Sequence, residues 1–208
     1  MSAAHPGGLP GRLAPDGLGD REAAWTTVRT ETVYDSAYLS LRLDTIADPG
    51  LAGGEEHVRA VVQPRGAVGV LALDGEDRVL LVEQYRHAAG RRMIELPAGI
   101  CDVAGEGAQA TAARELAEEA DLRADDWSDL LVVRTSPGYS TETFTIFRAT
   151  GLHALPEPER TVREAEEAGL EQWWLPFDEA VAAVLDGRIG NALAAAAILA
   201  EHARRSRA

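Results

Sequence analysis

The chain has 208 residues, of which 46% are apolar and 26% charged, and its formal net charge is −14. This is ordinary globular composition, and the length suits one domain with an appendage or two closely joined units. Nucleic acids and anionic membrane surfaces recruit proteins through basic patches. A chain this acidic therefore argues against both as primary partners.

The cysteine content and the apolar runs bear on the compartment. The single cysteine, Cys101, excludes an internal disulfide and fits a reducing cytosol, and we expect it to be packed and inert. The N-terminus lacks the basic, apolar and small-residue pattern of a signal peptide. The longest apolar run, 192–200, is far shorter than the roughly 20 residues that span a bilayer. We expect a soluble cytoplasmic protein with no membrane contact.

The first third of the chain predicts a tail followed by a small sheet. Residues 1–22 are rich in Gly and Pro, which predicts a flexible tail. Three segments then alternate polar and apolar residues, which predicts three strands of a small sheet, with a turn-rich stretch at 48–56. These segments are 26–34, 39–46 and 57–63.

The rest of the chain predicts alternating strands and helices. Segments 66–74 and 78–85 are dense in Val and Leu around the turn DGED, which predicts a buried hairpin. An acidic loop is expected at 155–170. Further strands are expected at 93–99, 130–136, 143–150 and 171–176. Helices are expected at 108–121, 178–185 and 191–205.

The helix expected over 108–121 concentrates negative charge. At 100° per residue, Glu115, Glu118 and Glu119 share one face, called here the glutamate face. The apolar residues of roughly the opposite arc are expected to pack into a core. They are Ala113, Leu116, Ala117 and Ala120.

The glutamate face has two interpretations. No Arg or Lys is positioned as an i+4 partner, so the sequence predicts that the repulsion is left uncompensated. One interpretation is a solvated acidic surface. The other is a site for a hard divalent cation, because Mg²⁺ binds through a few carboxylates together with phosphate oxygens of a substrate.

The stretch from Gly99 to Leu122, GICDVAGEGAQATAARELAEEADL, resembles the Nudix box. That pattern is Gly, five residues, Glu, seven residues, then Arg-Glu-apolar-any-Glu-Glu-any-Gly-apolar. The spacing from Glu106 to Arg114 matches, as do residues 114–119. Two positions depart: six residues separate Gly99 from Glu106, and Asp121 stands where the pattern has Gly. Asp tolerates the left-handed conformation of a helix end better than most residues, so we expect a modest stability cost.

The flanking segments resemble the ADP-ribose pyrophosphatase branch of this family. Pro137 follows Leu122 by fifteen residues, and EQYRH, ELPAG and LDGRIGNALAAAAILAEH are similar to that branch. The resemblance covers about residues 25–203. It implies an α+β fold: a Nudix α/β/α sandwich with a mixed sheet over 65–208. A small N-terminal β unit at 23–64 would precede it and be exchanged across a homodimer.

The resemblance also implies a metal site. Glu115 and Glu119, with Glu118 close by, would hold Mg²⁺, with Mn²⁺ as a substitute, and the main-chain oxygen of Ala98 would add a ligand. Gly99 and Glu106 would support the site, Glu106 by pairing with Arg114.

Other residues would act on the substrate. Glu142 would be the general base, with Glu118 and Arg114 as further catalytic residues. Arg86 would contact the phosphate or the terminal ribose, Arg59 would reach the ligand from the N-terminal unit, and Pro137 would belong to the substrate loop. Against these roles, Arg59 and Arg86 could be surface ion pairs, and Glu142 an exposed loop carboxylate.

The implied reaction is Mg²⁺-dependent hydrolysis of ADP-ribose to AMP and ribose 5-phosphate. One alternative is a broader hydrolase of nucleoside-diphosphate sugars or oxidised nucleoside diphosphates on the same scaffold. Another is a non-catalytic module that senses ADP-ribose and regulates a partner. Such modules usually lose box glutamates, all of which this chain retains.

Overall fold

The computed structural model describes residues 9–48, 55–163 and 169–207. Parts of the expected tail, of the turn-rich stretch and of the acidic loop therefore lie outside the described residues. Two compact units divide the chain: Met1–Thr30 with Asp44–Arg59, and Glu31–Leu43 with Ala60–Ala208. The domain boundaries expected from the sequence stay a prediction.

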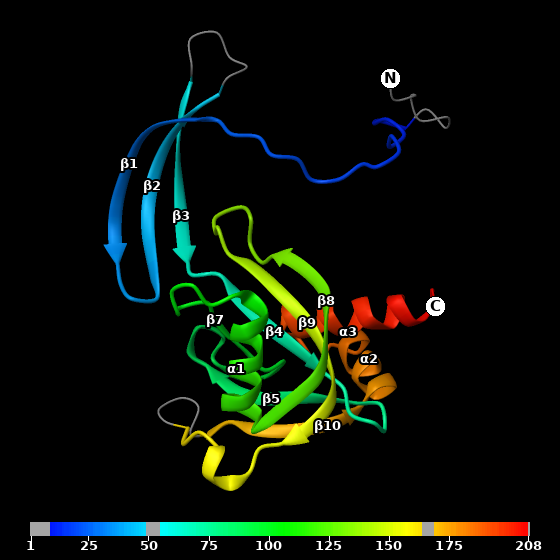
Figure 1. Cartoon of the computed structure of the whole chain (residues 1–208). Helices are drawn as coiled ribbons and strands as arrows, with labels where there is room; N and C mark the ends of the chain where they lie inside the picture. Colours follow the sequence, from blue (N-terminus) through cyan, green and yellow to red (C-terminus); the bar gives the residue numbers. More distant parts are fainter. Residues whose placement is uncertain (1–8, 49–54, 164–168, 208) are drawn as a thin grey trace. The chain divides into compact units, whose positions relative to one another are not determined.

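The first three strands form a sheet of their own (Figure 1). They are β1 (Thr26–Asp35), β2 (Leu39–Ala47) and β3 (Glu56–Pro64), with β2 in the middle. The structure thus confirms the three strands that the alternating segments predict. Every residue of β1 is exposed, so this sheet buries little apolar surface of its own.

A second, four-stranded sheet lies at the centre of the larger unit. Its order is β7 (Ala98–Ile100), β4 (Ala67–Ala72), β9 (Thr143–Ala154) and β8 (Leu122–Arg134). Strand β4 runs parallel to β9 and antiparallel to β7, and β8 is antiparallel to β9, so the sheet is mixed. Strand β8 begins earlier than expected, because its polar first half reads as a loop but pairs with β9 along its length.

The third sheet has the order β10 (Glu171–Pro176), β5 (Arg78–Arg86) and β6 (Arg91–Glu95). The predicted hairpin of β4 and β5 is therefore wrong. Leu73 and Val79 form only an isolated bridge, because β4 pairs with β7 and β9 while β5 pairs with β10 and β6. The strand expected at 93–99 likewise divides between two sheets.

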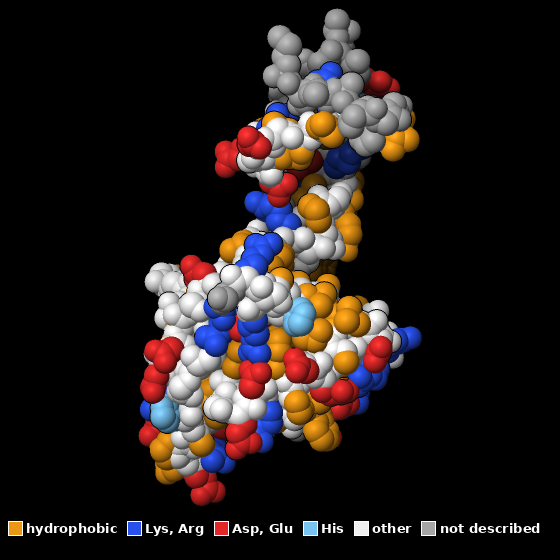
Figure 2. Space-filling view, turned by 90° about the vertical axis from the view of Figure 1, so that its right-hand side faces the viewer, with side chains coloured by type: hydrophobic (Ala, Val, Ile, Leu, Met, Phe, Trp, Pro, Cys, Tyr) orange, Lys and Arg blue, Asp and Glu red, His pale blue; other side chains and the backbone are white. Residues whose placement is uncertain are grey.

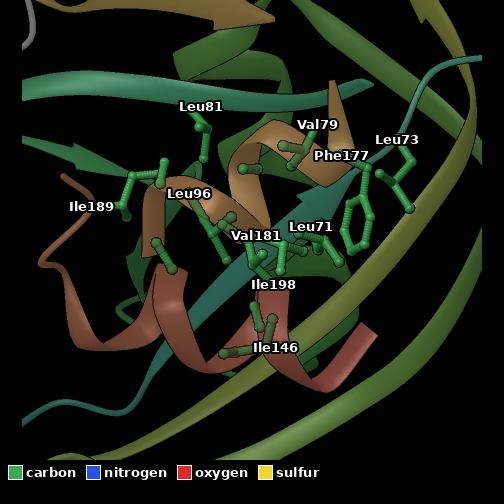
Figure 3. Close-up of a cluster of buried hydrophobic side chains, with 14 of the residues drawn as sticks. Leu71, Leu73, Val79, Leu81, Leu96, Ile146, Phe177, Val181, Ile189 and Ile198 are labelled. Carbon is green, nitrogen blue, oxygen red and sulfur yellow. The ribbon is translucent and has the colours of Figure 1, made fainter. Parts of the chain in front are cut away.

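Three helices complete the larger unit: α1 (Ala108–Ala120), α2 (Phe177–Leu185) and α3 (Ala192–Arg205). All three were expected. Val68 and Val70 of β4 pack with Leu116 of α1 in one apolar cluster. The other face of β4, through Leu71, packs with α2 and α3 in a second cluster (Figure 3).

Strand β4 is thus buried on both faces, which explains its almost uninterrupted apolar sequence. Helix α1 covers one face of the mixed sheet, and α2 and α3 cover the other. The fold is α+β with a mixed sheet between helical layers, as the sequence predicts. Within the described residues, no helix combines the length and the apolar character that crossing a membrane requires.

Candidate active site

Strand β7 lies directly against the glutamates of α1. A Cβ atom added to Gly99 would collide with the carboxylate carbon and both carboxylate oxygens of Glu115. The next residue back, Ala98, donates its backbone N–H to Glu119 Oε2 at 2.8 Å. Glu115 and Glu119 are only 8% and 5% exposed. Two carboxylates one turn apart are therefore buried against two consecutive residues of β7.

This packing corrects the predicted faces of the helix. Ala113 and Ala117, expected in the core, are only half-buried, whereas Leu116 and Ala120 are buried. Two of the three glutamates lie on the buried side because the backbone of β7 offers them contacts. The buried residues of α1 are Thr111, Ala112, Glu115, Leu116, Glu119 and Ala120.

Arg114 supplies the counter-charge that the sequence seemed to lack. Its Nη1 donates to Glu115 Oε1 at 2.7 Å and to Glu118 Oε2 at 3.0 Å. The prediction of uncompensated repulsion is therefore wrong, because the compensating cation precedes Glu118 by one turn. Burial opposes the charged form of Arg114, but the hydrogen bond to Glu106 and the charges of Glu115 and Glu118 raise its pKa above the usual value.

The same guanidinium holds the loop that precedes the helix. Arg114 Nη2 lies 3.2 Å from Glu106 Oε2 and 3.4 Å from Asp102 Oδ1. Glu106 Oε2 also accepts a hydrogen bond from the buried Thr111 hydroxyl at 2.9 Å. The loop is thus fixed to α1 in spite of its extra residue.

Cys101 is half-buried and packs at the edge of an apolar cluster.

The donor atoms here suit a hard divalent cation in kind. Glu115 and Glu119 bring carboxylate oxygens to β7. In the described ranges, no group of three or more His, Cys, Asp or Glu side chains is arranged to hold a metal. Because Mg²⁺ is usually held by one or two carboxylates together with substrate phosphates, two buried carboxylates are a sufficient protein contribution.

A cavity of about 130 Å³ adjoins this point. Arg86 lies in its wall, with Nη2 2.7 Å from Oε2 of the buried Glu95. Arg86 and Ala98, expected to contact substrate and metal, therefore line one cavity. Neither Glu95 nor Asn191 stands out in the sequence. The lining residues are Gly69, Arg86, Glu95, Leu96, Ala98, Phe144, Asn191 and Leu193.

Glu142 ends a loop that the structure holds at several points. Its Oε2 accepts a hydrogen bond from the Thr135 hydroxyl at 2.5 Å, and its N–H donates to Ser140 Oγ at 3.1 Å. Val62 N–H donates to Tyr139 O at 2.8 Å, and Val62 O accepts from Thr141 N–H at 3.0 Å. Sequence reasoning missed both Thr135 and Val62.

The register of the mixed sheet relates this loop to the loop before α1. Ala67 of β4 pairs with both Ile100 of β7 and Phe144 of β9. The loop that ends at Glu142 and the loop that leads to Glu106 therefore leave the sheet at the same end. Pro137 lies exposed in a turn of the first of these loops.

Arg59 belongs to β3 in the smaller unit. It is exposed, and its Nη1 donates to the neighbouring carbonyl of Val58 at 3.1 Å. The role expected for it stays a prediction.

Comparisons with known proteins agree with the fold. The family model described as NUDIX domain matches residues 63–196. The chain is 43% identical over 182 residues to an ADP-ribose pyrophosphatase of Mycobacterium tuberculosis, covering 88% of this chain and 85% of that protein. It is 31% identical over 163 residues to a methanol dehydrogenase activator of Bacillus methanolicus, covering 78% and 84%.

Among solved structures, the fold is similar to a crystal structure of an ADP compounds hydrolase. The TM-score is 0.73 at 20% identity, over 88% of this chain and 95% of that one. The family match and the glutamates of α1 together indicate a hydrolase. The chain belongs to the Nudix hydrolase family.

Proposed function

We propose that the protein hydrolyses ADP-ribose to AMP and ribose 5-phosphate with the help of a divalent cation, Mg²⁺ or, in its place, Mn²⁺. The observation that carries this proposal is the burial of Glu115 and Glu119 against β7, beside a cavity walled by Arg86. The 43% identity to an enzyme named for this activity supports the choice of substrate.

In this proposal the residues of α1 and β7 form the cation site. Glu115, Glu119 and the main-chain oxygen of Ala98 hold the cation, and Glu118 lies at its more exposed side. Once bound there, a divalent cation polarises a phosphoryl oxygen and lowers the pKa of a water molecule. Arg114, fixed by Glu106, holds Glu115 and Glu118 in place through ion pairs when no cation is present.

In this proposal Arg86 binds the substrate and Glu142 assists the attack of water. Arg86, oriented by Glu95, gives a charge-assisted contact to a phosphate or the terminal ribose. Glu142 accepts a proton from the attacking water, and Thr135 fixes the direction of its carboxylate. Pro137 shapes the loop of Glu142, and Arg59 reaches the ligand from the smaller unit.

We also infer a homodimer. The β1–β2–β3 sheet has exposed apolar side chains, and a small sheet needs an apolar face packed against another element for stability. Figure 2 shows exposed apolar side chains over the part of the molecule that contains these strands. Val28, Val33, Tyr34 and Val58 are each between 52% and 56% exposed. A second copy of the same sheet would cover the face that carries Val28 and Tyr34.

Two other functions compete with ADP-ribose hydrolysis. A broader hydrolase would act on nucleoside-diphosphate sugars or oxidised nucleoside diphosphates in the same cavity. The other is a regulatory module that binds ADP-ribose without cleaving it; the Bacillus methanolicus relative is named as an activator of another enzyme, methanol dehydrogenase. The retained glutamates favour catalysis, because a sensor has no need of two buried carboxylates at a metal site.

A product assay distinguishes these functions. Purified protein is incubated with Mg²⁺ and ADP-ribose, ADP-glucose or an oxidised guanosine diphosphate, and kcat/KM is compared. We expect ADP-ribose to be preferred, with AMP and ribose 5-phosphate as products and no turnover in excess chelator. A preference for the oxidised nucleotide would refute the proposal that ADP-ribose is the substrate. Tight binding of ADP-ribose without turnover would identify a sensor. Location in the cytoplasm stays a prediction.

A further inference from the structure

The C-terminal end of α1 is held by side chains from distant parts of the chain. A helix leaves its last carbonyls without partners inside the helix. Here Glu118 O accepts a hydrogen bond from Arg163 Nε at 2.9 Å, and Glu119 O accepts one from Gln172 Nε2 at 3.0 Å. Both carbonyls belong to residues of the glutamate face. The end of this helix is therefore fixed by tertiary contacts.

Asp121 is an unfavourable residue for the position that follows. It adopts the left-handed conformation, with φ 56° and ψ 35°, where the Nudix pattern has Gly. Its negative charge lies at the end of the helix that already carries partial negative charge. Its Oδ1 is buried and makes no hydrogen bond to any described residue. Alone, this side chain would loosen the last turn of α1.

Arg163 offsets the charge of Asp121 and also bonds a carbonyl at the end of the helix, although Asp121 Oδ1 still makes no hydrogen bond to any described residue. Its Nη2 lies 2.7 Å from Asp121 Oδ2, while its Nε bonds Glu118 O. No basic residue lies in the last turn of α1 itself. Arg163 thus brings the positive charge that the helix end requires, and both side chains of the pair are 20% exposed.

Fixing the end of α1 also restrains the glutamate face, because the bonded carbonyls belong to Glu118 and Glu119 themselves. Glu119 is held through its main chain by Gln172 and through its carboxylate by Ala98. Glu118 is held through its main chain by Arg163 and through its carboxylate by Arg114. A frayed last turn would release the main-chain half of each support, so the carboxylates would lose their common direction.

We propose that Asp121 and Arg163 form a positioning pair that sets the geometry of Glu118 and Glu119 toward a divalent cation. This inference rests on the proposed function, in which these glutamates face the cation. The pair replaces the glycine of the family pattern: a charged residue ends the helix, and a partner 42 residues away makes it acceptable. Neither residue touches substrate, and both act through the glutamates.

Four variants test the pair: Arg163→Ala, Arg163→Lys, Asp121→Gly, and Arg163→Ala combined with Asp121→Gly. The control is Arg160→Ala, since Arg160 lies in the same segment and its side chain donates to Leu155 O at 3.0 Å, not to a carbonyl of α1. The readout is the dissociation constant for Mn²⁺ alone, from the signal of free Mn²⁺ in electron paramagnetic resonance. Melting temperature and the kinetics of ADP-ribose hydrolysis are recorded beside it.

We expect Arg163→Ala to weaken Mn²⁺ binding about tenfold, the lower range for residues that orient metal ligands. kcat should fall while KM for ADP-ribose changes little, and Arg160→Ala should match wild type. Arg163→Lys should recover only part of the affinity, because an ammonium group lacks the planar fork that serves two acceptors. Asp121→Gly should restore most of the affinity in the Arg163→Ala background, by removing the unpaired carboxylate.

The pair is overturned if Arg163→Ala binds Mn²⁺ as tightly as Arg160→Ala does, even where its melting temperature falls. It is also overturned if wild type binds no Mn²⁺, or if Asp121→Gly fails to rescue Arg163→Ala. The proposed function stands or falls separately, on hydrolysis of ADP-ribose by wild type. A wild type that binds Mn²⁺ without hydrolysis, with weaker binding in Arg163→Ala, would refute the function and keep the pair.

Discussion

The Thr135 hydroxyl donates a 2.5 Å hydrogen bond to Glu142 Oε2, which ties the carboxylate to the strand end across its loop. One carboxylate oxygen is thereby fixed, and in the proposed mechanism this carboxylate takes a proton from water. The bond is short, as hydroxyl–carboxylate bonds are.

Thr135→Val should lower kcat about 10-fold, which is a part of the roughly 10²–10⁴-fold that a positioned base contributes, and leave KM nearly unchanged. The side chain keeps its shape but loses the donor, so Glu142 should sample other directions. Thr135→Ser should recover most of the rate. Thr30→Val removes a similar bond, 2.8 Å to Asp44 Oδ1, outside the proposed catalytic residues, and serves as control. Equal rates for Thr135→Val and wild type would show that the orientation of Glu142 by Thr135 does not matter for catalysis.

Gly99→Ala should damage the site sharply. The new methyl group would occupy the space of the Glu115 carboxylate, so either β7 or α1 must move. We expect a loss of about 1–3 kcal/mol in the free energy of unfolding, typical of overpacking, measured by urea denaturation. Cation affinity should fall with it. Gly75→Ala is a matched control, since a Cβ there meets no atom within 4 Å. A Gly99→Ala protein as stable and active as this control would refute the packing argument.

Sequence reasoning located the glutamate helix and most strands because local signals specify them. The Ala-rich stretch and the spacing of its glutamates fix α1, and polar–apolar alternation fixes β1 to β3. The pairing of β4 with β5 was wrong for a physical reason. The sequence of an apolar strand that is buried on both faces does not indicate which strand pairs with it. Here β4 pairs with β7 and β9, which are distant in the sequence.

The supports of the site were not predictable in the same way. Thr135, Glu95 and Arg163 are ordinary residues in the sequence, and only the fold brings them to Glu142, Arg86 and Asp121. Arg114 was recognised as a partner of Glu106, but its bonds to Glu115 and Glu118 depend on the rotamer that burial selects. Sequence motifs indicate the groups expected to react. The residues that orient those groups through tertiary contacts have no recognisable local pattern in the sequence.

Glu119→Gln should abolish most of the activity while leaving the fold intact. The amide keeps the shape of the side chain, and its oxygen can still accept the Ala98 N–H. The lost negative charge should reduce kcat on the order of 100-fold at fixed Mg²⁺, since a metal ligand is removed. Glu179→Gln, at an exposed ion pair with Arg188, should behave as wild type. Full activity of Glu119→Gln would exclude Glu119 from the cation site.

The buried carboxylate of Glu201 on α3 should make stability depend on pH. It is 0% exposed and contacts three guanidinium groups, from Arg148, Arg204 and Arg205. Burial alone would raise its pKa, but the hydrogen bonds from Arg204 and Arg205 and the charge of Arg148 outweigh burial and lower the pKa to about 2.

Because the folded-state pKa lies below the ordinary value of 4.5, the charged network stabilises the fold above that pH. This stabilisation, on the order of 3 kcal/mol, should disappear as the pH falls from 4.5 toward 2. Glu201→Gln removes the titrating group and leaves three cations around a neutral amide, so it should be several kcal/mol less stable at pH 7. Urea denaturation at pH 7, 4.5 and 3 should show the difference between wild type and Glu201→Gln shrinking with acid. A difference between wild type and Glu201→Gln that is constant across these pH values would mean that Glu201 does not carry this charge.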